Sequence, residues 1–372
     1  MGSGARVVWS LVIGLPMCLG LVGCCIVGDR AGAFEEQRFK ERDVSYSQTH
    51  PEKDVKQEKR QPVKLARLDK IKPVKKAKQV KQSPQMLTLL RTVKDVSLPQ
   101  SIVYDPKKLQ FYVSRLGAKP GDNTGQIALL SRDGSLVASD WIQGLDQPRG
   151  LALLGDYLYV ADGKALVEID IANSKISNRF VIDDVFYFYD VVASAEGQLF
   201  ISAPLNNAIY VLDKGRSLKL WVQNSTLSGP NGLGIDQDHL YVGSIGLETV
   251  DKPSATANKK RGGLYKVSLQ TRAIEPFTTH RLPPIASIAS DEQGFVYASD
   301  EDGASLFRFD LSNGSFVEEI NVARTFGLKQ TTGLGDFAYL IGSKEFWVPV
   351  KSNGHILVFG RSDEKILTQD EP

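Results

Sequence analysis

Cysteine is absent from all but the first 25 residues of this 372-residue chain, where Cys18, Cys24 and Cys25 are found. The rest of the chain therefore has no disulfide, no thiolate metal site and no cysteine nucleophile, so packing and strand pairing must stabilise it. Methionine and tryptophan are also scarce, with three and four residues. A Met-rich or Trp-rich binding surface is thus not indicated.

Familiar catalytic patterns are missing as well. The sequence contains neither a G-x-S-x-G turn nor a phosphate-binding glycine loop with its lysine. Three of the four histidines, His239, His280 and His355, lie in or beside expected turns and strands, and no serine and aspartate partners can be assigned to them. We therefore assign no catalytic residue.

Charge is distributed unevenly behind a formal net charge of +2. Residues 34–85 contain 15 Lys and Arg against 8 Asp and Glu, whereas residues 86–372 carry a net charge of −6. An acidic body argues against nucleic-acid binding. The lysines of the basic segment are not interleaved with aromatic residues, which a single-stranded nucleic acid would require. No nucleic-acid partner is expected.

The one long apolar run follows Arg6 and covers Val7–Gly28. A basic start followed by an apolar core is typical of an export signal. A transmembrane anchor is the alternative, because the run reaches about 20 residues. Pro16 and the glycines make it a poor spanning helix, so export is favoured.

Two cleavage sites compete in this leader. Leu21-Val22-Gly23-Cys24 resembles a bacterial lipobox, in which the cysteine is lipidated and becomes the mature N-terminus. Ala31-Gly32-Ala33 instead fits ordinary signal peptidase. We favour lipidation at Cys24. Because Cys25 and not aspartate follows, we expect a periplasmic lipoprotein anchored in the outer membrane.

The basic segment 34–85 has few apolar residues and four prolines. It cannot bury enough surface to offset the entropy of ordering, so we expect a disordered linker. It either binds anionic head groups or cell-wall polymer, or is a solvated spacer without a partner. The expected organisation is leader 1–33, Lys-rich linker 34–85, folded domain 86–362 and tail 363–372.

One motif recurs through the folded domain: a turn, an apolar strand, a short polar turn and an aromatic-rich strand. Clear copies begin at Pro148-Arg149-Gly150-Leu151 and at Pro230-Asn231-Gly232-Leu233, and end at Leu158–Asp162 and Leu240–Ser244. The spacing of about 40 to 50 residues is that of four-stranded propeller blades. The sequence therefore predicts an all-β fold.

Strand patterns divide the domain into six units. The first two units are expected at about 97–140 and 141–183. The sixth lacks an obvious fourth strand, which Met86–Val93 could supply from the other terminus, with Lys365–Thr368 as the competing candidate. Closing the ring in this way removes free sheet edges. We therefore predict a monomeric six-bladed β-propeller, with loop insertions at Arg115–Gly125 and Thr249–Gly262.

Around Pro230-Asn231-Gly232-Leu233 the chain resembles the six-bladed SMP-30/gluconolactonase/LRE family, and the resemblance covers about 97–360. Asp146–Leu151, Gly263–Val267 and Val103–Pro106 support it. Such phrases recur in other propellers, notably NHL proteins. The resemblance implies a divalent cation on the propeller axis, such as Ca²⁺, that polarises a lactone carbonyl or phosphoryl oxygen.

The family's metal-ligand positions are only partly retained. The blade-one Glu falls on Gln100, the blade-three Asn on Tyr189 and the late Asp on Ala286, whereas the blade-four Asn is kept as Asn231. The loss of two carboxylates removes most of the charge that holds a hard cation. We therefore expect no cofactor, although Asn231 with Asp190 could form a weaker divalent-cation site.

The same alignment places a set of polar residues at one mouth of the axis. This candidate axial pocket consists of Gln100, Arg149, Asp190, Asn231 and Asp336. It could bind a polar small molecule or a peptide end; alternatively, Arg149 pairs with an aspartate and the mouth holds water. We expect an exported, lipid-anchored module that binds a ligand or protein partner with little or no catalysis. The alternative is a metal-dependent lactonase or phosphotriester hydrolase.

Overall fold

The computed structural model describes residues 87–247, 261–291, 293–327, 333–352 and 354–361, which belong to the unit Gln79–Pro372. The leader with Cys24, the linker 34–85, Lys365–Thr368 and most of the Thr249–Gly262 insertion lie outside these residues. Within the described ranges, no helix is long and apolar enough to cross a membrane.

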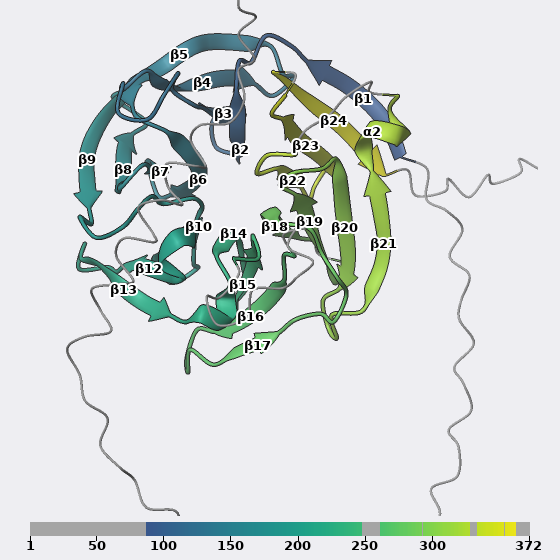
Figure 1. Ribbon diagram of the computed structural model, residues 1–372. Coiled ribbons are helices and arrows are strands. Elements are labelled where there is room, and N and C mark those ends of the chain that lie inside the picture. The colour runs from purple at the N-terminus through teal and green to yellow at the C-terminus, as the bar shows by residue number, and fades with distance from the viewer. Residues whose placement is uncertain (1–86, 248–260, 292, 328–332, 353, 362–372) are drawn as a thin grey trace, which may run out of the picture. The chain divides into compact units, whose positions relative to one another are not determined.

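Six antiparallel sheets of four strands are arranged around a central axis, with the first strand of each blade innermost (Figure 1). Blades 1 to 3, from the axis outward, are β2 (Pro99–Asp105), β3 (Gln110–Arg115), β4 (Gly125–Ser131), β5 (Leu136–Leu145); β6 (Pro148–Leu154), β7 (Tyr157–Asp162), β8 (Ala165–Asp170), β9 (Lys175–Val181); and β10 (Val191–Ala193), β11 (Leu199–Ala203), β12 (Ala208–Leu212), β13 (Leu218–Gln223). The chain is therefore the six-bladed β-propeller that the repeat predicts.

Blades 4 to 6, in the same order, are β14 (Pro230–Ile235), β15 (His239–Ser244), β16 (Leu264–Ser268), β17 (Ile274–Pro276); β18 (Ile285–Ser290), β19 (Phe295–Asp300), β20 (Ser305–Asp310), β21 (Phe316–Asn321); and β22 (Ala338–Leu340), β23 (Glu345–Val350), β24 (His355–Arg361), β1 (Leu87–Val93). Short helices in the connections are Pro204–Asn206, Ser225–Leu227 and α2 (Val322–Thr325). The strand content is thus that of an all-β protein.

The ring closes with the N-terminal strand. β1 pairs antiparallel with β24, from Leu87 opposite Arg361 to Val93 opposite Ile356, and the two strands lie side by side in Figure 1 at opposite ends of the colour scale. This confirms the prediction that Met86–Val93 supplies the missing fourth strand of blade 6. Pairing strands from both ends of the chain covers the edge that β24 would otherwise expose.

One predicted boundary is wrong. The sequence places the first unit at 97–140, but β5 continues to Leu145, so residues 141–145 belong to blade 1. Register shifts interrupt the pairing of β4 with β5 at three points. Each bulge inserts unpaired residues and lengthens the strand, which a count of alternating residues cannot anticipate.

The core lies between the blades. Six apolar clusters of buried side chains each join two neighbouring sheets, and the last joins blade 6 to blade 1. The aromatic residues of the second strands dominate these contacts; Phe111 of β3 packs on Trp347 of β23, for example, with ring centroids 4.0 Å apart. Burial of such large rings fixes the angular position of each blade about the axis.

Buried serines fix the inner strands to one another. Ser114 accepts a hydrogen bond from the Ser101 amide and donates one to the carbonyl of Arg149 in the next blade, at 2.6 Å. Ser202 likewise accepts from the Asp190 amide and donates to the Asn231 carbonyl. Second-strand serines therefore connect neighbouring inner strands close to the axis.

Candidate functional site

Counting from the paired residues of the inner strands places three successive layers of residues around the axis, at the start of the strand in four blades and at or just before the start of β10 and β22 in the other two. The rim layer consists of Gln100, Arg149, Tyr189, Asn231, Ala286 and Gly335. The aspartate layer consists of Ser101, Gly150, Asp190, Gly232, Ser287 and Asp336. The apolar layer consists of Ile102, Leu151, Val191, Leu233, Ile288 and Phe337. Each blade contributes one residue to each layer.

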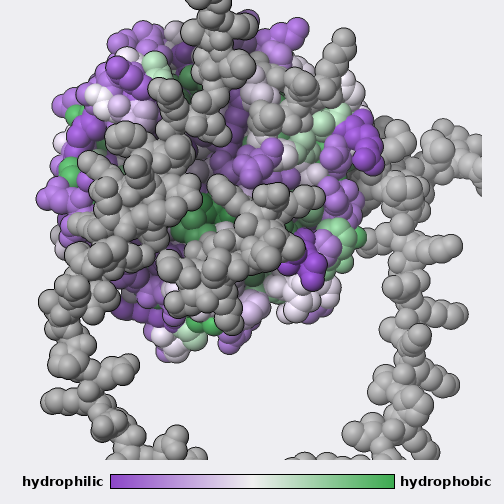
Figure 2. All heavy atoms as spheres, in the orientation of Figure 1, coloured by the Kyte–Doolittle hydropathy of each residue, from purple (hydrophilic) through white to green (hydrophobic). Residues whose placement is uncertain are grey.

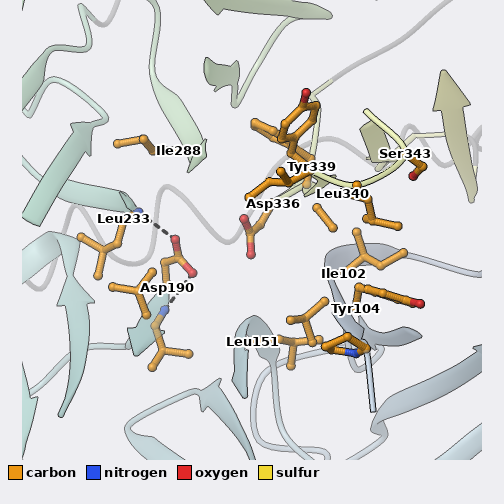
Figure 3. A pocket seen from close by; sticks show the side chains of 18 of the residues that line it. Ile102, Tyr104, Leu151, Asp190, Leu233, Ile288, Asp336, Tyr339, Leu340 and Ser343 are labelled. Carbon is orange, nitrogen blue, oxygen red and sulfur yellow. Dashed lines mark hydrogen bonds between the residues drawn. The ribbon is translucent and has the colours of Figure 1, made fainter. Parts of the chain in front are cut away.

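A cavity of about 780 Å³ occupies the axis below the rim. All six residues of the apolar layer line it, and further lining residues come from β2, β22 and the turn after β22. In Figure 2, apolar residues are visible near the middle of the ring, whereas the outer surface is mainly hydrophilic. Asp190 and Asp336 both line the cavity, and Figure 3 shows their carboxylates pointing toward each other.

Asp336 is held by two hydroxyl groups from the neighbouring blades. Ser101 of β2 donates to Oδ2 and Ser287 of β18 donates to Oδ1, each at 2.5 Å. These bonds join the last blade to the first and the fifth. They also fix the direction of the carboxylate, because each oxygen has one hydrogen bond from the protein.

Asp190 is held by backbone groups. The Val191 amide donates to Oδ1 and the Leu233 amide to Oδ2, both at 2.7 Å. Its neighbour Gly150 in the aspartate layer is a glycine for a steric reason: a Cβ there would lie 2.3 Å from Asp190 Oδ1 and 2.5 Å from its Cα. Glycine at this position gives Asp190 the space that it occupies.

Both carboxyl groups have raised pKa values. Burial raises the pKa of Asp336 to about 6, against the opposing effects of the Ser101 and Ser287 hydrogen bonds and the charge of Lys351. Burial also raises the pKa of Asp190 well above its usual range, and the negative charge of Asp336 raises it further. The two acids therefore resist being ionised together in this apolar setting.

The rim layer leads into a second polar group, the rim cluster, which consists of Arg149, Tyr189, Asn231, Glu301 and Lys351. Glu301 is its centre: the Tyr189 hydroxyl donates to Oε2, and Lys351 Nζ donates to Oε1 at 2.5 Å. The Asn231 side-chain amide donates to Oε2 at 3.3 Å. The Arg149 guanidinium lies over the Tyr189 ring, 5.4 Å from its centroid.

Charge pairing sets the protonation state of the rim cluster. Burial acts to raise the pKa of Glu301, but the ammonium of Lys351 and the hydroxyl of Tyr189 outweigh it, so the pKa lies below its usual value. Burial and the charge of Glu301 hold the pKa of Tyr189 well above its usual value. Glu301 is thus an ionised carboxylate with a fixed lysine as its counter-ion.

The five residues of the predicted axial pocket are divided between two layers. Arg149 and Asn231 belong to the rim layer, and both contact the rim cluster. Asp190 and Asp336 belong to the aspartate layer and line the cavity. Gln100 is a rim-layer residue whose buried amide donates to the Pro99 carbonyl at 3.4 Å.

The donor set at the rim does not fit a divalent cation. Asn231 Oδ1 is buried without a hydrogen-bond partner among the described groups, so one oxygen is available. Glu301, the carboxylate nearest to that amide, already binds Lys351. Within the described ranges no three His, Cys, Asp or Glu side chains gather as a metal-binding group. A hard cation needs six or more oxygens and prefers charged ones.

Sequence reasoning missed Glu301 and Lys351. Both follow the second strand of their blade by one residue, after Asp300 in β19 and after Val350 in β23. They therefore occupy equivalent places in blades 5 and 6. An alignment of β19 with β23 could have found them. Both strands contain an aromatic residue, then a small apolar residue, then Ser or Pro, two positions before Glu301 and Lys351.

Comparisons with known proteins agree with this architecture. A family model described as the LVIVD repeat matches residues 147–179, a stretch that covers most of blade 2. No curated protein matches the sequence.

Two solved structures show the same fold. A protein assigned as a gluconolactonase superposes with a TM-score of 0.55 at 13% identity, covering 76% of this chain and 93% of its own. A gluconolactonase from Xanthomonas campestris, described as important in secondary glucose metabolism, gives a TM-score of 0.54 at 14% identity, covering 74% of this chain and 89% of its own. Likeness at such identities establishes the fold and not the activity.

Proposed function

We propose that this six-bladed propeller, similar in fold to gluconolactonases and containing an LVIVD repeat, is an exported module that binds a small ligand on its axis with little or no catalysis. The observation that carries the proposal is the cavity of about 780 Å³ on the axis. Its size and apolar walls with two convergent carboxylates are those of a small-molecule site.

The site contains few elements of catalysis. The two serine hydroxyls that bind Asp336 donate hydrogen bonds to its carboxylate, and among the described residues no hydrogen bond joins either of them to a histidine that could activate it. Asp190 is occupied by two backbone amides. Side chains held in fixed directions in this way suit the positioning of a bound molecule better than its chemical conversion.

Export and anchoring complete the proposal. Lipidation at Cys24 would place the propeller in the periplasm at the outer membrane, with the Lys-rich linker 34–85 between lipid and domain. Mass spectrometry of the mature N-terminus tests this. A diacylglyceryl group on Cys24 is expected, whereas a mature chain that starts at Phe34 would show ordinary signal cleavage.

A second function, metal-dependent lactone hydrolysis, is favoured by one observation. Asn231 retains the position of a gluconolactonase metal ligand, and its buried Oδ1 has no partner among the described residues. Metal analysis of dialysed protein, together with a gluconolactone hydrolysis assay, distinguishes the two functions. We expect no stoichiometric metal and no hydrolysis. Bound calcium with activity that is lost in Asn231→Ala would establish the lactonase instead.

A further inference from the structure

The two aspartates of the cavity come from opposite blades. In a six-bladed ring, blade 3 with Asp190 faces blade 6 with Asp336 across the axis, and Figure 3 shows the two carboxylates facing each other. The other four residues of the aspartate layer are two serines, which bind Asp336, and two glycines beside Asp190. The layer is therefore arranged so that two carboxylates, and no other charged group of that layer, face the axis.

The cations near this pair are already bound to other carboxylates. Lys351, whose charge acts on Asp336, is paired with Glu301 at 2.5 Å. Arg132, which lines the cavity from the turn after β4, is paired with Glu345 at 2.9 Å and lies over the Tyr104 ring. Tyr104 and Tyr339 are the remaining titratable groups in the lining. When these two acids are ionised, no described group within the cavity neutralises their charge.

We propose that the axial cavity binds an organic ammonium ion, with the charged nitrogen between Asp190 and Asp336 and an apolar body against the apolar layer. This rests on the proposed function, a ligand-binding cavity, and adds the chemical class of the ligand. Among the described residues, each carboxylate oxygen accepts a single hydrogen bond and has a further lone pair for a donor. An N–H donor placed between them makes charge-assisted hydrogen bonds to both sides.

Other ligand classes fit less well. An anion would meet two acidic side chains, and a neutral molecule would offer no charge to stabilise their ionised form in an apolar setting. A bare divalent ion would need more oxygen ligands than the two side chains supply, because the adjacent layer is aliphatic and aromatic. An ammonium group attached to an apolar body is complementary to both the pair of carboxylates and the apolar layer.

Binding should depend on pH in a defined direction. The cation requires ionised carboxylates, and burial holds the pKa of Asp336 at about 6 and that of Asp190 well above its usual value. Affinity for an ammonium ion should therefore rise between pH 5 and pH 8 as protons leave the pair. A neutral ligand of the same shape should show no such rise.

Calorimetry and thermal-shift measurements with matched probes test the proposal on the full-length mature protein. The probes are butyl-, hexyl-, benzyl- and phenethylammonium, each with its alcohol, together with benzoate and calcium ion. At pH 8 we expect the best ammonium probe to bind at least about tenfold more tightly than its alcohol, since a charge-assisted pair replaces neutral hydrogen bonds. The advantage should shrink at pH 5, and benzoate should not bind.

Two variants separate charge from shape. Asp336→Asn should abolish the preference for ammonium over alcohol, and Asp190→Asn should do the same if the first variant folds poorly. The control Asp213→Asn removes a surface carboxylate that pairs with Lys219 and should leave binding unchanged. Equal binding of alcohols and ammonium ions at pH 8 would overturn the ammonium proposal but keep the ligand-binding function. If no probe of either class binds, both are overturned.

Discussion

At the scale of single residues, the most informative position is Asp336, a carboxylate from the last blade that is bonded to the first and the fifth. A group whose pKa is raised on folding binds its proton more tightly in the folded than in the unfolded state. The folded protein therefore loses stability as pH rises from about 4, the pKa of an unfolded aspartate, to about 6, the pKa of Asp336. Above that range the cost is constant.

Asp336→Asn should remove this cost. The shift from 3.8 to about 6 corresponds to about 3 kcal/mol at most, so we expect the variant to be more stable than wild type by about 1 to 3 kcal/mol at pH 8 and no more stable at pH 4. The amide can still accept from one serine and donate to the other. Urea unfolding across this pH range measures the difference.

Asp213→Asn serves as the reference for removal of an exposed carboxylate. Its effect on stability should not follow the same pH course, because the pKa of Asp213 is lowered, first by its hydrogen bond from Lys219. A stability difference between Asp336→Asn and wild type that is independent of pH would show that Asp336 is not perturbed by burial.

Gly150 gives a second test at this scale. In Gly150→Ala the new methyl group would meet the backbone and carboxylate of Asp190 at 2.5 and 2.3 Å, so the inner strands of blades 2 and 3 must separate. We expect a loss of about 2 to 4 kcal/mol in unfolding free energy, measured by denaturant titration. Gly342→Ala, where nothing lies within 4 Å, should be nearly neutral. Equal stability of the two variants would contradict the close packing of the aspartate layer.

At the scale of strands, the sequence predicts more of the fold than of the site. Second strands such as Leu158–Asp162 and Leu240–Ser244 repeat one buried pattern, because each packs between neighbouring blades and must bring the same kinds of side chain. The pairing of the inner strands is less regular. Four of them have register shifts where the rim and aspartate layers lie, for example between Pro148 and Leu151.

These bulges lie at Gln100, Arg149 and Asn231, the three residues of the predicted pocket that belong to the rim layer. A bulge breaks the alternation of a strand and turns it, so a count of alternating residues cannot place such side chains. Asp190 and Asp336 instead precede the three-residue strands β10 and β22 and line the cavity. Glu301 and Lys351 escaped prediction for a related reason: their pairing joins two turns 50 residues apart, and only the folded ring brings such turns together.

The closing strand β1 supports a test at the scale of one element. A chain that starts at Lys94 would lose β1 and expose the edge of β24, whereas a chain that starts at Met86 keeps the whole ring. We expect the unfolding midpoint of the shorter chain to fall by at least about 5 °C, equivalent to about 2 kcal/mol in a domain of this size. The free edge should also promote self-association, measured by light scattering. Two chains with the same midpoint and mass would mean that β1 is not required for closure.

At the scale of the whole molecule, a propeller brings one strand end from every blade to a common axis, so polar groups that are far apart in sequence have to be compatible there. In this ring the charge of Glu301 from blade 5 is balanced by Lys351 from blade 6. Tyr189 from blade 3 and Asn231 from blade 4 donate hydrogen bonds to the same carboxylate. The lysine thus neutralises the axial carboxylate without an added ion.

Lys351→Met should therefore make the stability of the protein depend on added cations, whereas we expect no such dependence in the wild-type protein. Its removal leaves Glu301 unpaired in a half-buried site, where side-chain exposure is 20%, at a cost of about 2 to 4 kcal/mol. Calcium should recover part of that stability in the variant, because Glu301 and Asn231 Oδ1 then have oxygens free for a metal. The wild-type unfolding midpoint should respond neither to calcium nor to a chelator.

Lys219→Met is the control. It breaks an exposed ion pair with Asp213 and should change stability by less than about 1 kcal/mol, with no effect of calcium. A wild-type midpoint that falls on chelation would show that the axis depends on a bound metal and that the lysine does not replace it.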